Sequence, residues 1–147
     1  MSYSKPLYYQ DEFWNAVSHG IGLLLALIGG YFIFYNAIGR VPDHELNALA
    51  IYIAGAAFVY ASSTAYHAAP PGTLKDRLQT IDHISIFFMI AGSHTPIILK
   101  YFNNTDGTVF LGIMWSMVFV GTIFKLITSA NRFETLSVAM YIMMGLM

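Results

Sequence analysis

The sequence has 147 residues, of which 56% are hydrophobic and only 10% are charged. Soluble domains carry about 25% charged residues, and disordered segments combine low hydrophobicity with high charge, so this composition argues against both classes. The net charge of −1 lacks the basic excess of nucleic-acid-binding proteins, and the absence of cysteine excludes disulfides and thiolate metal sites. An integral membrane protein is the class that fits. A spanning helix needs about 20 apolar residues, so this length allows four spans and part of a fifth.

Long stretches without Asp, Glu, Lys or Arg mark the predicted spans. Turn-forming residues bound each stretch, such as Pro70, Pro71 and Gly72 between the second and the third. The pattern predicts helices over residues 16–38, 46–69, 79–101, 108–128 and 134–147. Strict two-residue alternation, which is typical of barrel strands, is missing. We therefore predict an all-α fold, a polytopic transmembrane helix bundle, with residues 1–147 forming a single membrane domain.

The positions of lysine and arginine predict the orientation, because cytoplasmic loops carry an excess of these residues. Five of the seven fall on the N-terminal side of the membrane and two fall on the other side. The first group is Lys5, Lys75, Arg77, Lys125 and Arg132, and the second is Arg40 and Lys100. The N-terminus is therefore expected in the cytoplasm.

Polar residues gather at this same end of three predicted helices. Helical spacings of i, i+3, i+7 and of i, i+4 place the groups on the first and second helices on one face each. Ionisable groups inside a membrane are costly and mark candidate functional sites. The residues are Glu12, Asn15 and His19 on the first helix, Ser63 and His67 on the second, and Asp82 and His83 on the third.

These residues also have purely structural interpretations. Glu12 and Asn15 could stabilise a helix N-terminus, where negative charge meets the positive end of the helix dipole. His19 could form a hydrogen bond between helices, and His67 could be an interfacial histidine. Asp82 could be a solvated residue at the lipid–water boundary. Spacing alone leaves both interpretations open.

Small residues predict close helix packing at two places. Gly22, Ala26 and Gly30 recur every four residues on the first helix. Small residues at this spacing allow two membrane helices to approach closely. Gly55 and Ala56 predict a similar approach by the second helix.

Three motifs resemble those of a known family. Residues 12–22 are similar to the E-x-x-N-x-x-x-H-G-x-G opening of the bacterial hemolysin III proteins, and residues 63–67 resemble their S-x-x-x-H motif. Residues 82–87 and 91–96 resemble their D-H-x-x-I-[FY] and A-G-[ST]-x-T-P signatures. The resemblance covers essentially the whole chain. This family belongs to the larger group that includes the progestin and adipoQ receptors.

The resemblance implies a fold of seven transmembrane helices in a bacterial inner or plasma membrane, of which this chain holds four full spans and part of a fifth. It also implies zinc as a cofactor, with His67 as one ligand. Ser63 and Asp82 are similar to residues that lie beside the zinc and its water, so they are the candidate catalytic residues. A supporting polar cluster is expected from Glu12, Asn15, His19 and His83.

One feature of the family is absent from this sequence. The other two zinc ligands form an H-x-x-x-H pair on the last family helix, whereas no histidine follows His94 here. We therefore expect a C-terminally incomplete fragment, which by itself binds zinc weakly or not at all.

The full-length form is expected to be a zinc-dependent hydrolase of lipid amides or esters, with membrane lipid as its partner and substrate. Asp82 would accept a proton from the zinc-bound water, and Ser63 would orient it. The alternatives are a membrane-damaging cytolysin or pore, and a receptor or sensor with structural zinc. No nucleic-acid partner is predicted, and the oligomeric state is left open.

Overall fold

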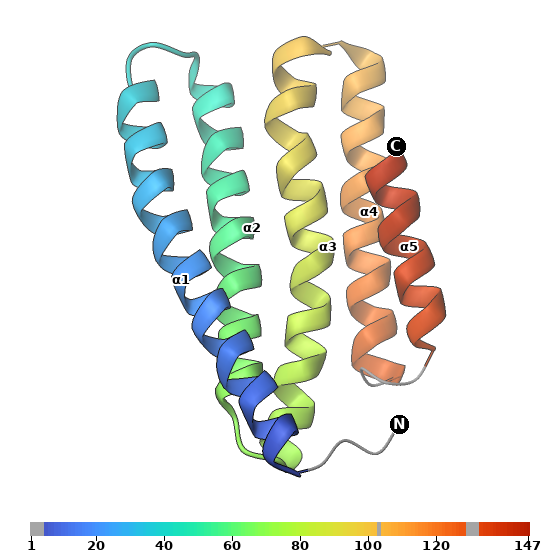
Figure 1. Cartoon of the computed structure of the whole chain (residues 1–147). Coiled ribbons are helices and arrows are strands. Elements are labelled where there is room, and N and C mark those ends of the chain that lie inside the picture. The colour runs from blue at the N-terminus through green and yellow to red at the C-terminus, as the bar shows by residue number, and fades with distance from the viewer. Residues whose placement is uncertain (1–4, 103, 129–132) are drawn as a thin grey trace.

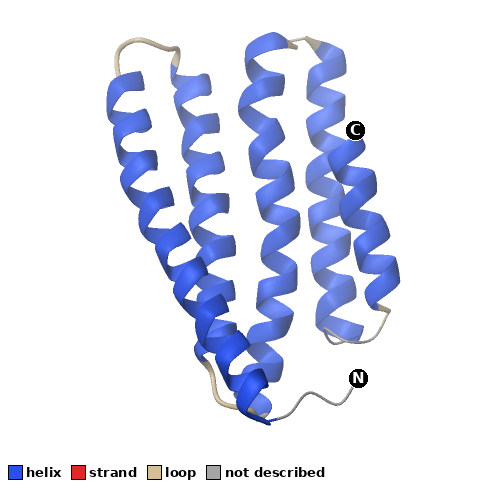
Figure 2. Ribbon diagram, in the orientation of Figure 1, coloured by secondary structure: helices blue, strands red, loops and turns tan. Residues whose placement is uncertain are grey.

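The computed structural model describes residues 5–102, 104–128 and 133–147, which form five α-helices and no strand (Figure 2). The predicted all-α class is confirmed. The first four helices are each long and apolar enough to cross a membrane, and the fifth is a shorter apolar helix. The helices are α1 (Lys5–Ala37), α2 (Asp43–Ala68), α3 (Thr73–Tyr101), α4 (Thr105–Thr128) and α5 (Glu134–Leu146).

The observed helices end within one residue of the predicted C-terminal boundaries, but several begin earlier than predicted. α1 begins at Lys5 instead of residue 16, and α3 begins at Thr73 instead of residue 79. Charged residues in these early turns are unfavourable in lipid but compatible with a helix, so charge-free stretches underestimate helix length. The early turns matter because they carry Glu12 and Lys75.

The helices form a sequential, antiparallel arrangement. α1 packs along α2, α2 along α3 and α3 along α4, while α5 packs against both α3 and α4. The start of α1, the α2–α3 turn and the start of α5 therefore lie at the same end, the lower one in Figure 1. α3 is the central helix. In its most apolar stretch of 18 residues 39% of the residues are buried, against 6% in the corresponding stretch of α1. The outward face of α1 is therefore suited to contact with lipid.

A compact apolar core joins α3, α4 and α5. Phe87 and Met114 are fully buried at its centre, together with Met144 of α5. A Cβ atom on Gly121 would lie 2.5 Å from the Phe87 ring, so the glycine provides the space that this ring occupies. The core holds α5 against the long helices.

The predicted close approach between helices is confirmed. A Cβ atom on Gly22 would lie 2.6 Å from the Tyr60 ring, and one on Gly30 would lie 2.6 Å from the Ile53 side chain. The α2–α3 contact is tight on both sides. A Cβ atom on Gly55 would lie 3.2 Å from the carbonyl oxygen of Phe88, and one on Gly92 would lie 3.3 Å from that of Ile51.

Replacing Gly55 by Leu should destabilise the bundle. The added side chain meets the backbone of α3, which cannot rotate away, and overpacking of this kind costs about 1–3 kcal/mol. The thermal midpoint of unfolding in detergent micelles measures the effect. Gly112→Leu is the matched control, because nothing lies within 4 Å of a Cβ atom there. Equal midpoints for the two variants would contradict the tight α2–α3 contact.

Candidate functional site

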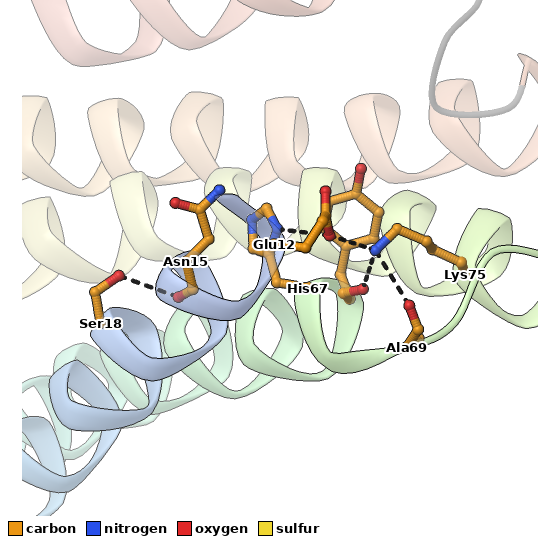
Figure 3. A network of polar contacts seen from close by, with 7 residues as sticks. Glu12, Asn15, Ser18, His67, Ala69 and Lys75 are labelled. Atoms are coloured by element: carbon orange, nitrogen blue, oxygen red, sulfur yellow. Dashed lines mark hydrogen bonds and ion pairs between the residues drawn. The ribbon is translucent and has the colours of Figure 1, made fainter. Parts of the chain in front are cut away.

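One carboxylate joins the ends of three helices, as Figure 3 shows. Oε2 of Glu12 on α1 lies 3.2 Å from Nδ1 of His67 on α2, and it accepts a hydrogen bond from the ammonium group of Lys75 on α3. The three side chains are only 18%, 16% and 9% exposed, respectively. The contacts are therefore largely shielded from water, and they link residues that are far apart in the sequence.

Lys75 also closes the C-terminal end of α2. Its Nζ donates to the carbonyl oxygens of Tyr66 at 2.9 Å and Ala69 at 3.3 Å, and it lies 4.5 Å from the centroid of the Tyr66 ring. Carbonyl groups at a helix C-terminus lack partners within the helix and carry partial negative charge, which a cation stabilises. The turn over residues 69–72 makes this geometry possible, with Gly72 at a positive φ of 148°.

The sequence did not predict this role of Lys75. The residue was interpreted only as one of the positive charges on the cytoplasmic side. The short Pro70–Pro71–Gly72 turn was the available signal, because it returns the first turn of α3 beside the last turn of α2. A lysine placed there can reach the free carbonyl groups at the end of α2.

His19 lies next to His67. The two ring centroids are 5.5 Å apart, and the His19 ring is 6.2 Å from that of Tyr60. Nδ1 of His19 is buried and has no hydrogen-bond partner among the described residues. The structure therefore brings two imidazoles together at the predicted end of the bundle, one of them with an unused buried nitrogen.

Asp82 and Ser63 meet where α3 packs on α2. The Ser63 hydroxyl lies beside the Asp82 carboxyl group, which interacts electrostatically with His83, His67 and His19. Ser63 is buried, and Asp82 is half-buried. A second polar contact between the two helices lies next to it, where the Ser62 hydroxyl donates a hydrogen bond to the Ser85 hydroxyl at 2.9 Å. The two candidate catalytic side chains are thus neighbours at the end of the bundle that holds His67.

Two members of the predicted supporting cluster lie elsewhere. Asn15 is exposed, and its side chain takes no part in the contacts drawn in Figure 3. Nδ1 of His83 lies 3.2 Å from Nζ of Lys125 on α4, and its carbonyl oxygen accepts a hydrogen bond from Tyr141 of α5 at 2.8 Å. His83 therefore joins α3 to α4 and α5, and of the four predicted residues only Glu12 and His19 lie against His67.

The metal-binding capacity of this region is partial. Across residues 5–102, 104–128 and 133–147, no three His, Cys, Asp or Glu side chains are grouped so that they could hold a metal ion. The side chains present nevertheless suit zinc. An imidazole nitrogen is a common zinc ligand, and a neighbouring carboxylate can accept and return a proton. His67, with Asp82 nearby, fits one part of such a centre.

A cavity of about 550 Å³ lies beside the Glu12–His67–Lys75 contacts. Its wall combines apolar and aromatic side chains of α1, including Tyr8, Phe13 and Val17, with the polar groups of this network. A cavity with both kinds of lining suits an amphipathic molecule, because the apolar part and the polar part each find a matching surface.

Residues 7–147 match the family described as Haemolysin-III related. The chain belongs to this family. It is 35% identical over 136 residues to the Hemolysin-3 homolog of Bacillus subtilis (strain 168), which covers 92% of this chain and 63% of that protein. It is 29% identical over 138 residues to Hemolysin-3 of Bacillus cereus, with 94% and 63% covered. No solved structure matches the chain significantly.

The family match and the four long apolar helices make this an integral membrane protein. The chain spans 63% of the length of each of these two relatives. The segments 12–22 and 63–67, which resemble motifs of the hemolysin III proteins, meet at the end of the bundle through Glu12 and His67. The membership and the geometry thus point to the same region.

Proposed function

We propose that the protein is a zinc-dependent hydrolase that cleaves an amide or ester bond of a membrane lipid. The observation that supports this most directly is that Ser63, His67 and Asp82 lie at the same end of an apolar bundle, where Asp82 interacts electrostatically with His67. Bound zinc would lower the pKa of its water to about 7 and make hydroxide available at neutral pH. The further ligands that the family resemblance implies are two histidines of the last family helix, which no residue of this sequence matches.

Each residue of the site has a distinct part in this proposal. His67 would hold the metal through Nε2, because its Nδ1 already contacts Glu12. Asp82 would accept a proton from the attacking water and return it to the leaving group. The Ser63 hydroxyl, which lies beside the Asp82 carboxyl group, would orient that water.

The surroundings favour a lipid substrate. The cavity beside His67 has apolar walls on α1, and the outward face of α1 exposes large apolar side chains such as Leu24, Leu25 and Ile28. An acyl chain could therefore enter from the bilayer while its polar linkage reaches the site. Lys75 and Arg77 lie at this end, which supports a cytoplasmic location for the site and the N-terminus.

Replacing His67 by Ala should remove zinc from the protein produced from its complete coding sequence. Elemental analysis of the purified protein, expressed as zinc per chain, is the measurement. His44→Ala is the matched control, since His44 is exposed in the first turn of α2 and should leave the zinc content unchanged. Full zinc content in the His67→Ala protein would overturn the ligand assignment.

A second measurement separates the proposed hydrolase from the cytolysin. Vesicles that contain the protein should release fatty acid from a lipid amide or ester, and a zinc chelator should stop the release. Leakage of ions that the chelator does not change, without any released fatty acid, would support a pore instead.

A further inference from the structure

The hydrogen atoms around Glu12 can be assigned from its contacts. The Lys75 nitrogen faces three oxygen acceptors, which are Oε2 of Glu12 and the carbonyl oxygens of Tyr66 and Ala69. Three acceptors require three N–H groups, and only the charged ammonium form of lysine has three. The same oxygen, Oε2, accepts from this ammonium group and faces His67, so it serves as an acceptor in both contacts.

The same reasoning determines the state of His67. Nδ1 lies 3.2 Å from an oxygen that can only accept, so Nδ1 must carry the hydrogen and donate it to Glu12. In the neutral ring, Nε2 is then bare and has a free lone pair. No described residue makes a hydrogen bond to Nε2. The His67 residue is part of the wall of the 550 Å³ cavity.

We propose that Glu12 is a positioning residue, which fixes His67 in the tautomer with its proton on Nδ1 and so presents Nε2 as the coordinating nitrogen. Lys75 of α3 holds the Glu12 carboxylate in place, and this carboxylate in turn contacts His67 of α2. Metal-bound histidines commonly donate their other N–H to a carboxylate, and loss of that carboxylate weakens metal affinity about 10–100-fold. The tautomer stands on the contacts alone, whereas the effect on zinc rests on the proposed function.

The test compares two variants in detergent micelles, with ¹⁵N-labelled histidine and NMR. Glu12→Leu combined with Lys75→Met removes the acceptor without leaving an unpaired buried charge. Asp11→Leu is the matched control, because Asp11 is the exposed acidic neighbour of Glu12 on α1. The His67 signals are assigned by their loss in His67→Asn.

In metal-free wild type and in Asp11→Leu, the neutral His67 ring should carry its proton on Nδ1 and leave Nε2 bare. In the double variant, the neutral ring should lose this preference and populate the tautomer with its proton on Nε2. A neutral ring with its proton on Nε2 in the wild type, or an unchanged tautomer in the double variant, would overturn the proposal. A merely structural role for Glu12 would leave the tautomer unchanged in the folded protein.

Zinc affinity, measured by competition with a chromogenic chelator on the protein from its complete coding sequence, is the second readout. The double variant should bind zinc about 10–100-fold more weakly than wild type, and Asp11→Leu should match wild type. Equal affinity in all three proteins would overturn the positioning role. If wild type itself binds no zinc, the proposed function fails, and the tautomer comparison still decides the role of Glu12.

Discussion

Replacing Asp82 by Asn should lower the hydrolysis of a lipid amide about 10²–10⁴-fold while zinc stays bound. The amide keeps the size of the side chain and can still pair with the Ser63 hydroxyl, but it cannot take up a proton. A loss of this size is the usual contribution of a positioned general base. Turnover in micelles and zinc per chain are measured on the same preparation.

Asp76→Asn is the control for this experiment, because Asp76 is an exposed aspartate on the same helix, nearer its start. It should keep both activity and zinc. Loss of zinc in Asp82→Asn would make Asp82 a direct ligand, and unchanged turnover would remove it from the chemistry. Either result would require a different proton acceptor at the site.

The helices could be predicted from the sequence because the membrane imposes a strong and simple pattern. Charge-free stretches and the Pro70–Pro71–Gly72 turn located the four long helices and their C-terminal ends. The early start of α1 could not be read from that pattern, since the turns that contain Glu12 are helical but polar. Hydropathy reports the apolar part of a helix, and the contacts of the polar part depend on tertiary structure.

The sequence predicted the site only to the extent that it showed which helix ends lie at the same membrane depth. That reasoning brought Glu12, His19 and His67 together, and the structure places them in contact. It could not assign His83, because neighbouring residues on a helix point about 100° apart, so Asp82 and His83 cannot both face α2. The rotation of α3 about its axis directs His83 toward Lys125.

The partner of Glu12 was hidden for a related reason. Lys75 is 63 positions away in the chain and sits where the positive-inside pattern already explains a lysine. Only the packing of α3 against the end of α2 shows that this side chain is buried, at 7% exposure for the whole residue. A lysine that the positive-inside pattern already explains can therefore also stabilise the packing of the helices.

Replacing Lys75 by Met should be among the most destabilising single changes in the bundle. The methionine keeps an apolar side chain of similar length, but it leaves the half-buried Glu12 carboxylate without its cation and the Ala69 carbonyl group without its donor. Removing one partner of a buried ion pair costs about 3–5 kcal/mol, mostly because the other charge remains uncompensated. The free energy of unfolding in mixed micelles is the measurement.

Two comparisons make the result specific to the pair. Lys100→Met changes a lysine at the other end of α3, which is exposed with its Nζ 5.6 Å from the Tyr101 ring centroid, and it should cost less than about 1 kcal/mol. Glu12→Leu combined with Lys75→Met removes both charges and should recover most of the stability lost in Lys75→Met, because no unpaired buried charge is left. A double variant as unstable as Lys75→Met would show that the hydrogen bonds of Lys75 to α2, and not its pairing with Glu12, hold the three helix ends together.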